Sequence, residues 1–248
     1  MKNLIVLFYL FLFSNLYSQV TQEWVARYNG PGNVSDYGSS IAVDGSGNVY
    51  VTGRSIGSGT NYDYSTIKYN SSGVQQWVAR YNGPGNNEDW AYSLAVDTLG
   101  NVYVTGTSIG SGTDWDYATL KYNSSGVQQW VARYNGPGNI SDVANSISID
   151  GSGNVYVTGG SWGVGGTNYD YATLKYNSDG VQQWVVRYNG LGNSYDFANS
   201  LVIDGSGNVY VTGVSRSSSF AGSEDYATLK YNSSGVQQWV ARYNGPGN

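Results

Sequence analysis

The sequence repeats itself with a period of about 53 residues. A Gln-Gln-Trp-Val motif (Gln-Glu-Trp-Val in its first copy) recurs five times, and its tryptophans are Trp24, Trp77, Trp130, Trp184 and Trp239. The stretches between the motifs are also similar, so the chain contains four complete units after a leading fragment. Self-similarity at a fixed period of this length is typical of propellers and other repeat arrays. Each unit is therefore expected to form one supersecondary module.

Each unit contains four strand-like runs that are separated by turn residues. In the first unit these runs are residues 40–43, 49–52, 64–69 and 74–81, and no window has a helical period. Four antiparallel strands in chain order form one propeller blade. The sequence thus predicts an all-β, propeller-like array of four-stranded antiparallel blades. The predicted repeats span about 34–86, 87–139, 140–193 and 194–248.

The turn between the first two runs carries a family resemblance. Ile41-Ala42-Val43-Asp44, followed by residues 47–53 (Gly-Asn-Val-Tyr-Val-Thr-Gly), resembles the bacterial beta-propeller repeat called SBBP and, more distantly, the NHL-type repeat. The match recurs at residues 97–106, 150–159 and 204–213. The resemblance implies a propeller in which the 40–43 type of strand is innermost and the 74–81 type outermost. It implies no ligand, because the family is defined by repeats in exported proteins and not by an active site.

The leading fragment raises the question of closure. Residues 23–29 are predicted to form a lone strand of the outermost type, and the last unit already has its own copy at residues 236–243. One interpretation is a truncated gene product, or an open arc that once continued into further blades. The alternative is a closed four-blade ring with the leading strand docked on an edge. Open arcs leave unpaired edges, which natural proteins usually cover.

The first 18 residues have the features of a secretory signal peptide. A short basic start at Lys2 precedes an apolar run from Leu4 to Phe13, and a small residue, Ser18, offers a cleavage site. The run is too short to span a membrane, which takes about 20 apolar residues. We therefore expect residues 19–248 to be the mature domain, with no membrane span. The expected location is secreted or at the cell surface, with the periplasm as an alternative.

Composition excludes several classes of chemistry. The chain has no His and no Cys, which excludes Ser-His-Asp and Cys-His nucleophile systems, the usual zinc sites and Fe–S clusters. The net charge is −5 and no basic block is present, which argues against a nucleic-acid partner. No cofactor and no catalytic residue is predicted. The expected partner is a protein or a glycan at the cell surface.

Three aspartates recur in every unit. The first series is Asp36, Asp89, Asp142 and Asp196; the second is Asp44, Asp97, Asp150 and Asp204; the third is Asp63, Asp116, Asp170 and Asp225. A ring of such carboxylates can bind a hard cation such as Ca²⁺. The favoured interpretation is that they cap turns by accepting backbone N–H bonds, so no metal site is assigned. Asp63 is also expected to pair with Arg80 on the neighbouring strand.

The loop between the second and third strands of each unit is the only place where the repeat length varies. It is also rich in aromatic residues, and insertions on one face often mark the binding face of a repeat protein. The candidate ligand-binding residues on this face are Tyr62, Trp90, Trp115, Trp162, Tyr169 and Phe220. The leading hypothesis is an exported, non-catalytic scaffold for structural or surface interactions. The alternatives are a carbohydrate-binding module on this face, and a polysaccharide hydrolase or lyase that uses carboxylates such as Asp114 or Glu224.

Overall fold

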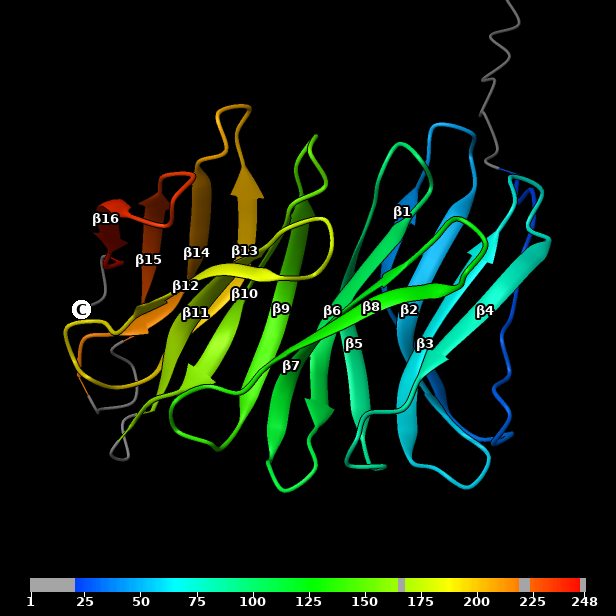
Figure 1. Cartoon of the computed structure of the whole chain (residues 1–248), viewed down its shortest axis with the longest axis horizontal. Helices are drawn as coiled ribbons and strands as arrows, with labels where there is room; N and C mark the ends of the chain where they lie inside the picture. The colour runs from blue at the N-terminus through cyan, green and yellow to red at the C-terminus, as the bar shows by residue number, and fades with distance from the viewer. Residues whose placement is uncertain (1–20, 165–167, 219–223, 246–248) are drawn as a thin grey trace, which may run out of the picture.

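The computed structural model describes residues 21–164, 168–218 and 224–245, so the predicted signal peptide lies outside the described residues. Within these ranges, sixteen β-strands form four four-stranded antiparallel sheets, each with its strands in chain order (Figure 1). The first two blades are β1 (Asp36–Val43), β2 (Val49–Ile56), β3 (Tyr62–Tyr69) and β4 (Gln75–Tyr81), then β5 (Asp89–Val96), β6 (Val102–Ile109), β7 (Trp115–Tyr122) and β8 (Gln128–Tyr134). The other two are β9 (Asp142–Ile149), β10 (Val155–Trp162), β11 (Tyr169–Tyr176) and β12 (Gln182–Tyr188), then β13 (Asp196–Ile203), β14 (Val209–Arg216), β15 (Glu224–Tyr231) and β16 (Gln237–Tyr243). The predicted all-β array of four blades is confirmed.

Several strands are longer than the sequence pattern predicts. β1 begins at Asp36 and β2 continues to Ile56, because Asp36 pairs with Ser55 and Ile56 pairs with Tyr62 of β3. The pattern hides these ends, because Gly and polar residues occupy them and a bulge interrupts the β1–β2 register between residues 38 and 40. In the structure, ladder hydrogen bonds compensate for the low strand propensity of these residues.

The turns at the ends of the hairpins follow the predicted chemistry. Gly47 and Gly73 adopt φ angles of 78° and 77°, a region that glycine enters without steric cost. In the first turn the Asp44 carboxylate accepts the backbone N–H groups of Ser46 and Asn48 at 2.9 and 3.0 Å. The second aspartate series therefore caps turns, as the sequence indicates.

The hydrophobic core lies between neighbouring blades rather than within one. The first interblade cluster includes Tyr50 and Tyr64 of one blade and Leu94 and Val104 of the next, and equivalent clusters lie at the other two junctions. The outermost strand contributes Trp77, whose indole lies 6.4 Å from the Tyr122 ring and donates to a backbone carbonyl of the following blade. Each blade therefore depends on its neighbour to bury its faces.

The array is open. The innermost strands contact one another in the order β1–β5–β9–β13, and the blades that contain β1 and β16 lie at opposite ends of the molecule (Figure 1). Among the described residues the four sheets do not close, so the structure agrees with the predicted open arc and not with the alternative of a closed four-blade ring. Within the same residues no helix is long and apolar enough to cross a membrane.

The leading segment does not form the predicted strand. Residues 21–30 carry no strand assignment, although their side chains dock on the first blade. The Trp24 ring lies 6.3 Å from the Tyr69 ring, and the Tyr28 hydroxyl accepts a hydrogen bond from Arg80 at 3.3 Å. No described strand pairs with this segment, so it fills the side-chain positions of an outermost strand without a backbone ladder.

Candidate functional site

Each blade has two ends that differ in chemistry. The loops between the second and third strands, together with the connections between blades, lie at one end, which we call the B–C end. The hairpin turns between the first and second strands and between the third and fourth strands lie at the other end, which we call the A–B end. This division follows from the antiparallel order of the strands. The first and third aspartate series therefore lie at the B–C end, and the second series lies at the A–B end.

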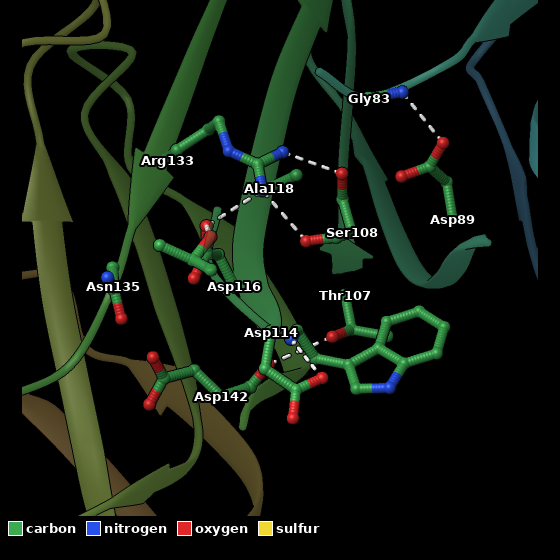
Figure 2. A network of polar contacts seen from close by, with 12 residues as sticks. Gly83, Asp89, Thr107, Ser108, Asp114, Asp116, Ala118, Arg133, Asn135 and Asp142 are labelled. Carbon is green, nitrogen blue, oxygen red and sulfur yellow. Dashed lines mark hydrogen bonds and ion pairs between the residues drawn. The ribbon is translucent and has the colours of Figure 1, made fainter. Parts of the chain in front are cut away.

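A buried polar network organises the B–C end of every blade. In the second blade, Arg133 of β8 reaches across to Ser108 and Asp116 (Figure 2). Its guanidinium donates to the Ser108 hydroxyl at 2.6 Å, to the Ser108 carbonyl at 2.8 Å and to Asp116 at 2.9 Å. A fourth contact joins Arg133 to the hydroxyl of Tyr81 in the preceding blade at 3.0 Å. The arginine thus ties together two strands of its own blade and one of its neighbour.

The same ion pair recurs in all four blades, which confirms the predicted partner of Asp63. The pairs are Asp63–Arg80 at 3.0 Å and Asp116–Arg133, Asp170–Arg187 and Asp225–Arg242 at 2.9 Å. The carboxylates are buried, with only 4–8% of each residue exposed. A pair in this setting is held by surrounding hydrogen bonds, and removal of one partner leaves an uncompensated buried charge.

The first aspartate series lies beside this network. Asp89 is fully buried and accepts the Gly83 backbone N–H at 2.7 Å (Figure 2). Burial raises the pKa of Asp89 to about 6, although the Gly83 N–H and the Ser108 side chain both favour the ionised form. Burial likewise raises the pKa of Asp142 and Asp196. These carboxyls fix the connection between blades.

Two aromatic clusters cover much of the B–C end. The first cluster consists of Tyr37, Arg54, Tyr62, Trp90 and Trp115. The Arg54 guanidinium lies 4.4 Å from the Trp90 ring centroid, and the Trp90 and Trp115 centroids are 5.0 Å apart. The structure therefore brings three predicted site residues, Tyr62, Trp90 and Trp115, together around one arginine.

The second cluster joins the third and fourth blades and consists of Trp162, Tyr169, Tyr195, Phe197 and Arg216. Trp162 lies 5.0 Å from Tyr169, which also contacts the Phe197 ring at 5.2 Å. These rings are half-buried, so much of their area packs on neighbours rather than facing solvent. The remaining predicted site residue, Phe220, lies outside the described residues.

The A–B end has clefts that the sequence analysis did not single out. One lies between the first two blades, has a volume of about 430 Å³ and is lined by Asp44, Tyr50, Lys68 and Asp97. Equivalent clefts of about 460 and 550 Å³ follow at the next two junctions. The Lys68 ammonium lies 5.2 Å from the Tyr50 ring centroid. Asp44 and Lys68 have an equivalent in every unit, and this recurrence is the sequence signal that marks the clefts.

The recurrent carboxylates of the described part of the chain are bonded to neighbouring protein groups. No group of three or more acidic residues there is placed to hold a metal ion. The third aspartate series is engaged by arginine, and the second by turn amides and asparagine. Hydrogen bonds from Asn48, Tyr50 and Ser46 outweigh the effect of burial and lower the pKa of Asp44 to about 2.

Four-stranded antiparallel blades, packed face to face and pinned by one repeated polar network, define a β-propeller repeat protein. The profile of the SBBP beta-propeller repeat matches residues 23–60, 76–112, 129–166 and 183–221. Because these stretches make up more than half of the chain, the protein belongs to the SBBP beta-propeller repeat family. A comparison with curated proteins finds no match.

Several solved structures resemble this chain at low identity. A gluconolactonase from Xanthomonas campestris is 14% identical with a TM-score of 0.47, and the match covers 85% of this chain and 62% of that one. A periplasmic gluconolactonase from Pseudomonas aeruginosa is 12% identical with a TM-score of 0.44, over 84% and 72% of the two chains. The GH43 endo-arabinanase from Bacillus licheniformis is 16% identical with a TM-score of 0.44, over 83% and 78%. At these values the likeness concerns the fold alone.

Proposed function

We propose that the protein is an exported, non-catalytic scaffold that presents its blades to a macromolecule at the cell surface. The observation that carries this proposal is that the recurrent carboxylates at the B–C end are paired or buried. Asp116 is paired with arginine, and Asp89 is fully buried on a backbone amide. A raised carboxyl pKa suits a general acid only where substrate reaches the group, and Asp89 has no exposed surface.

The carboxylates that the hydrolase hypothesis invokes are also engaged. Asp114 accepts the backbone N–H of Trp115 at 2.9 Å, and Glu224 forms an ion pair with Arg216 at 2.6 Å. Glycoside hydrolysis needs two carboxyls that face one substrate. Incubation with a panel of polysaccharides tests the proposal, and product formation at the level of the blank is expected. Turnover that is lost in both Asp114→Asn and Glu224→Gln would overturn it.

The specific partner class that the structure favours is a glycan, because the half-buried rings of both aromatic clusters gather at one end of the blades. Sugars stack on such rings through their apolar faces. Binding to a glycan array is expected to fall about 5- to 30-fold in Trp115→Ala and Trp162→Ala, since each removes a ring worth on the order of 1–2 kcal/mol of stacking. Val127→Ala removes an exposed apolar side chain from the β7–β8 hairpin turn, outside both clusters, and serves as the control.

Equal losses in Trp115→Ala, Trp162→Ala and the control variant would show that the aromatic clusters do not form the binding surface. Retained binding in Trp115→Ala and Trp162→Ala would have the same meaning. In either case the partner would contact another surface, and the clefts at the A–B end are the next place to examine. Substitution of Lys68 and Lys121, which line two of these clefts, addresses that alternative directly.

A further inference from the structure

The first blade exposes a face that every other blade buries. Ile41 of β1 is 67% exposed, whereas its equivalents are almost fully covered by the preceding blade. These equivalents are Leu94, Ile147 and Leu201, with exposures of 8%, 7% and 5%. The difference lies in position along the array and not in residue type, since all four side chains are large aliphatic groups. We call this surface of the first blade the leading face.

The last blade exposes the complementary surface, which we call the trailing face. Tyr226 of β15 is 66% exposed, whereas its equivalents Tyr64, Tyr117 and Tyr171 have no exposed surface. Each buried tyrosine inserts into the following blade and donates its hydroxyl to a backbone carbonyl there. The acceptors are the carbonyls of Ala118, Ala172 and Ala227, at 3.2, 3.3 and 3.2 Å. Val202 of β13, at 61% exposed, belongs to the same face.

A socket for such a tyrosine is present on the leading face. By repeat position, Ser65 corresponds to Ala118, and its carbonyl accepts the Thr52 hydroxyl just as that of Ala118 accepts Thr105. The Ala118 carbonyl also accepts Tyr64, and no described residue makes the equivalent bond to Ser65. Next to Ser65 lies Gly53, in a groove of about 350 Å³ that Ile41 also lines.

The glycine is part of the socket in the inner blades too. A Cβ placed at Gly106 would lie 2.8 Å from the Tyr64 hydroxyl, and one at Gly159 would lie 2.8 Å from the Tyr117 hydroxyl. Absence of a side chain at this position is therefore what lets a tyrosine from the preceding blade approach the backbone.

We propose that a second copy of this chain docks head to tail, with the trailing face of one copy on the leading face of the next. The Tyr226 hydroxyl of one copy then donates to the Ser65 carbonyl of the other, and Val202 enters the apolar surface around Ile41. The contact continues, between copies, the interface that the chain already repeats at its three internal junctions. The proposal is independent of which ligand the scaffold binds.

The outermost strand fits the same junction. Residues 22–29 and 237–244 differ only at Glu23 and Gln238, so both segments present the same tryptophan and tyrosine. Residues 22–29 dock on the first blade through side chains alone, whereas β16 forms a full ladder with β15. On docking, β16 of the arriving copy takes the place of the leading segment. Trp239 and Tyr243 then make the contacts to the first blade that Trp24 and Tyr28 make in the single copy.

The proposed contact is heterologous, because two different faces meet. Such contacts give rings when the rotation closes and open chains when it does not. Two copies supply eight blades, which is within the range of four to eight in typical propeller rings. The expected assembly is therefore a ring of two copies.

Sedimentation velocity and light scattering of the purified protein test the proposal. The wild-type protein is expected to have the mass of two copies. Ile41→Glu and Val202→Glu are each expected to weaken association by roughly 100-fold or more, because an unpaired carboxylate would be buried at the junction. Both positions are more than half exposed in the single copy, so the fold should persist, and circular dichroism verifies this.

Val181→Glu is the matched control. Val181 is 58% exposed and belongs to a valine position that is 57–58% exposed in all four blades, away from both end faces. This variant is expected to keep the mass of two copies. A wild-type protein that stays a single copy at all concentrations overturns the proposal. So does a mass of two copies in both Ile41→Glu and Val202→Glu.

Mixing separates the head-to-tail contact from a symmetric one. Ile41→Glu keeps an intact trailing face, and Val202→Glu keeps an intact leading face, so an equimolar mixture has one unaltered junction. The mixture is expected to form a one-to-one pair, although each variant alone stays a single copy. Absence of this pair overturns the assignment of the two faces.

Discussion

At the residue scale, the arginine on the fourth strand of each blade holds a carboxylate that water barely reaches. Arg133 contacts Ser108 and Asp116 in its own blade and Tyr81 in the one before. The same motif position in the leading segment, Arg27, is exposed. The same local sequence is therefore expected to contribute differently to the free energy of folding, depending on whether a blade surrounds it.

Substitution of this arginine provides the first prediction. Arg133→Ala is expected to lower the free energy of unfolding by about 2–4 kcal/mol, because Asp116 would remain buried without its counterion. Arg27→Ala removes the same side chain from the exposed leading segment, and its expected cost is below about 0.5 kcal/mol. Urea denaturation of both variants measures the difference, and equal losses would contradict the structural role of the ion pair.

The buried Asp89 predicts a pH dependence. Burial raises its pKa to about 6 in the folded protein, against 3.8 for an unperturbed aspartate. The folded state thus binds this proton more tightly, so the stability from this group is fully present below about pH 4 and is lost as the pH rises towards 6. Asp89→Asn should make this decline smaller. The free energy of unfolding that is lost between pH 4 and pH 7 should be lower in the variant than in the wild type by on the order of 1–2 kcal/mol.

Asp142 and Asp196 also have raised pKa values, so the decline should diminish in Asp89→Asn rather than disappear. Asp179 is exposed in a hairpin turn, and Asp179→Asn provides the control. Thermal unfolding between pH 4 and pH 7 gives the three profiles. A wild-type profile in which stability rises between pH 4 and 6, with the same rise in Asp89→Asn, would contradict the assignment.

At the scale of elements, the sequence predicts those features that depend only on residues within one repeat. The hairpin turns, the blade as a unit of four strands and the Asp63–Arg80 pair all follow from residues within one unit. The aromatic site residues are different, because contacts such as Tyr169 with Phe197 depend on how two blades face each other. The same limit explains why the burial of Asp89 and the lack of a strand at residues 21–30 could not be predicted from the sequence.

The glycine in the second strand of each blade shows how closely two strands can approach. A Cβ at Gly106 would lie 2.0 Å from the Trp90 carbonyl oxygen, beside the bulge in the β5–β6 register. Gly106→Ala is therefore expected to cost about 3 kcal/mol or more, since backbone atoms would have to move. Gly151→Ala, where nothing lies within 4 Å, is expected to stay within about 0.5 kcal/mol of the wild type. Denaturant midpoints for the pair measure this, and similar midpoints would refute the steric account.

At the scale of the whole molecule, blades of similar sequence are buried to different extents. The two inner blades are β5–β8 and β9–β12, and the two outer blades, at the ends of the array, are β1–β4 and β13–β16. The second strands β6 and β10 of the inner blades are almost entirely buried, whereas the equivalent strands β2 and β14 of the outer blades mix buried residues with partly exposed ones. In repeat proteins, stability is approximately the sum of the intrinsic stabilities of the repeats and the interfaces between neighbours. The two inner blades have two such interfaces and the outer blades only one.

This arrangement predicts a gradient of local stability along the chain. In the Val202→Glu variant, which keeps the end faces apart, amide hydrogens of β6, β7, β10 and β11 should exchange slowest and those of β16 fastest, because local opening near the ends breaks fewer interblade contacts. In the wild-type protein, association covers the end faces, so protection of β1–β3 and β13–β15 should rise towards the inner level. Hydrogen exchange followed by mass spectrometry at high and low protein concentration measures both effects. Uniform exchange in Val202→Glu would mean that the four blades open as one unit, and unchanged protection of the end blades in the wild type would mean that no partner covers them.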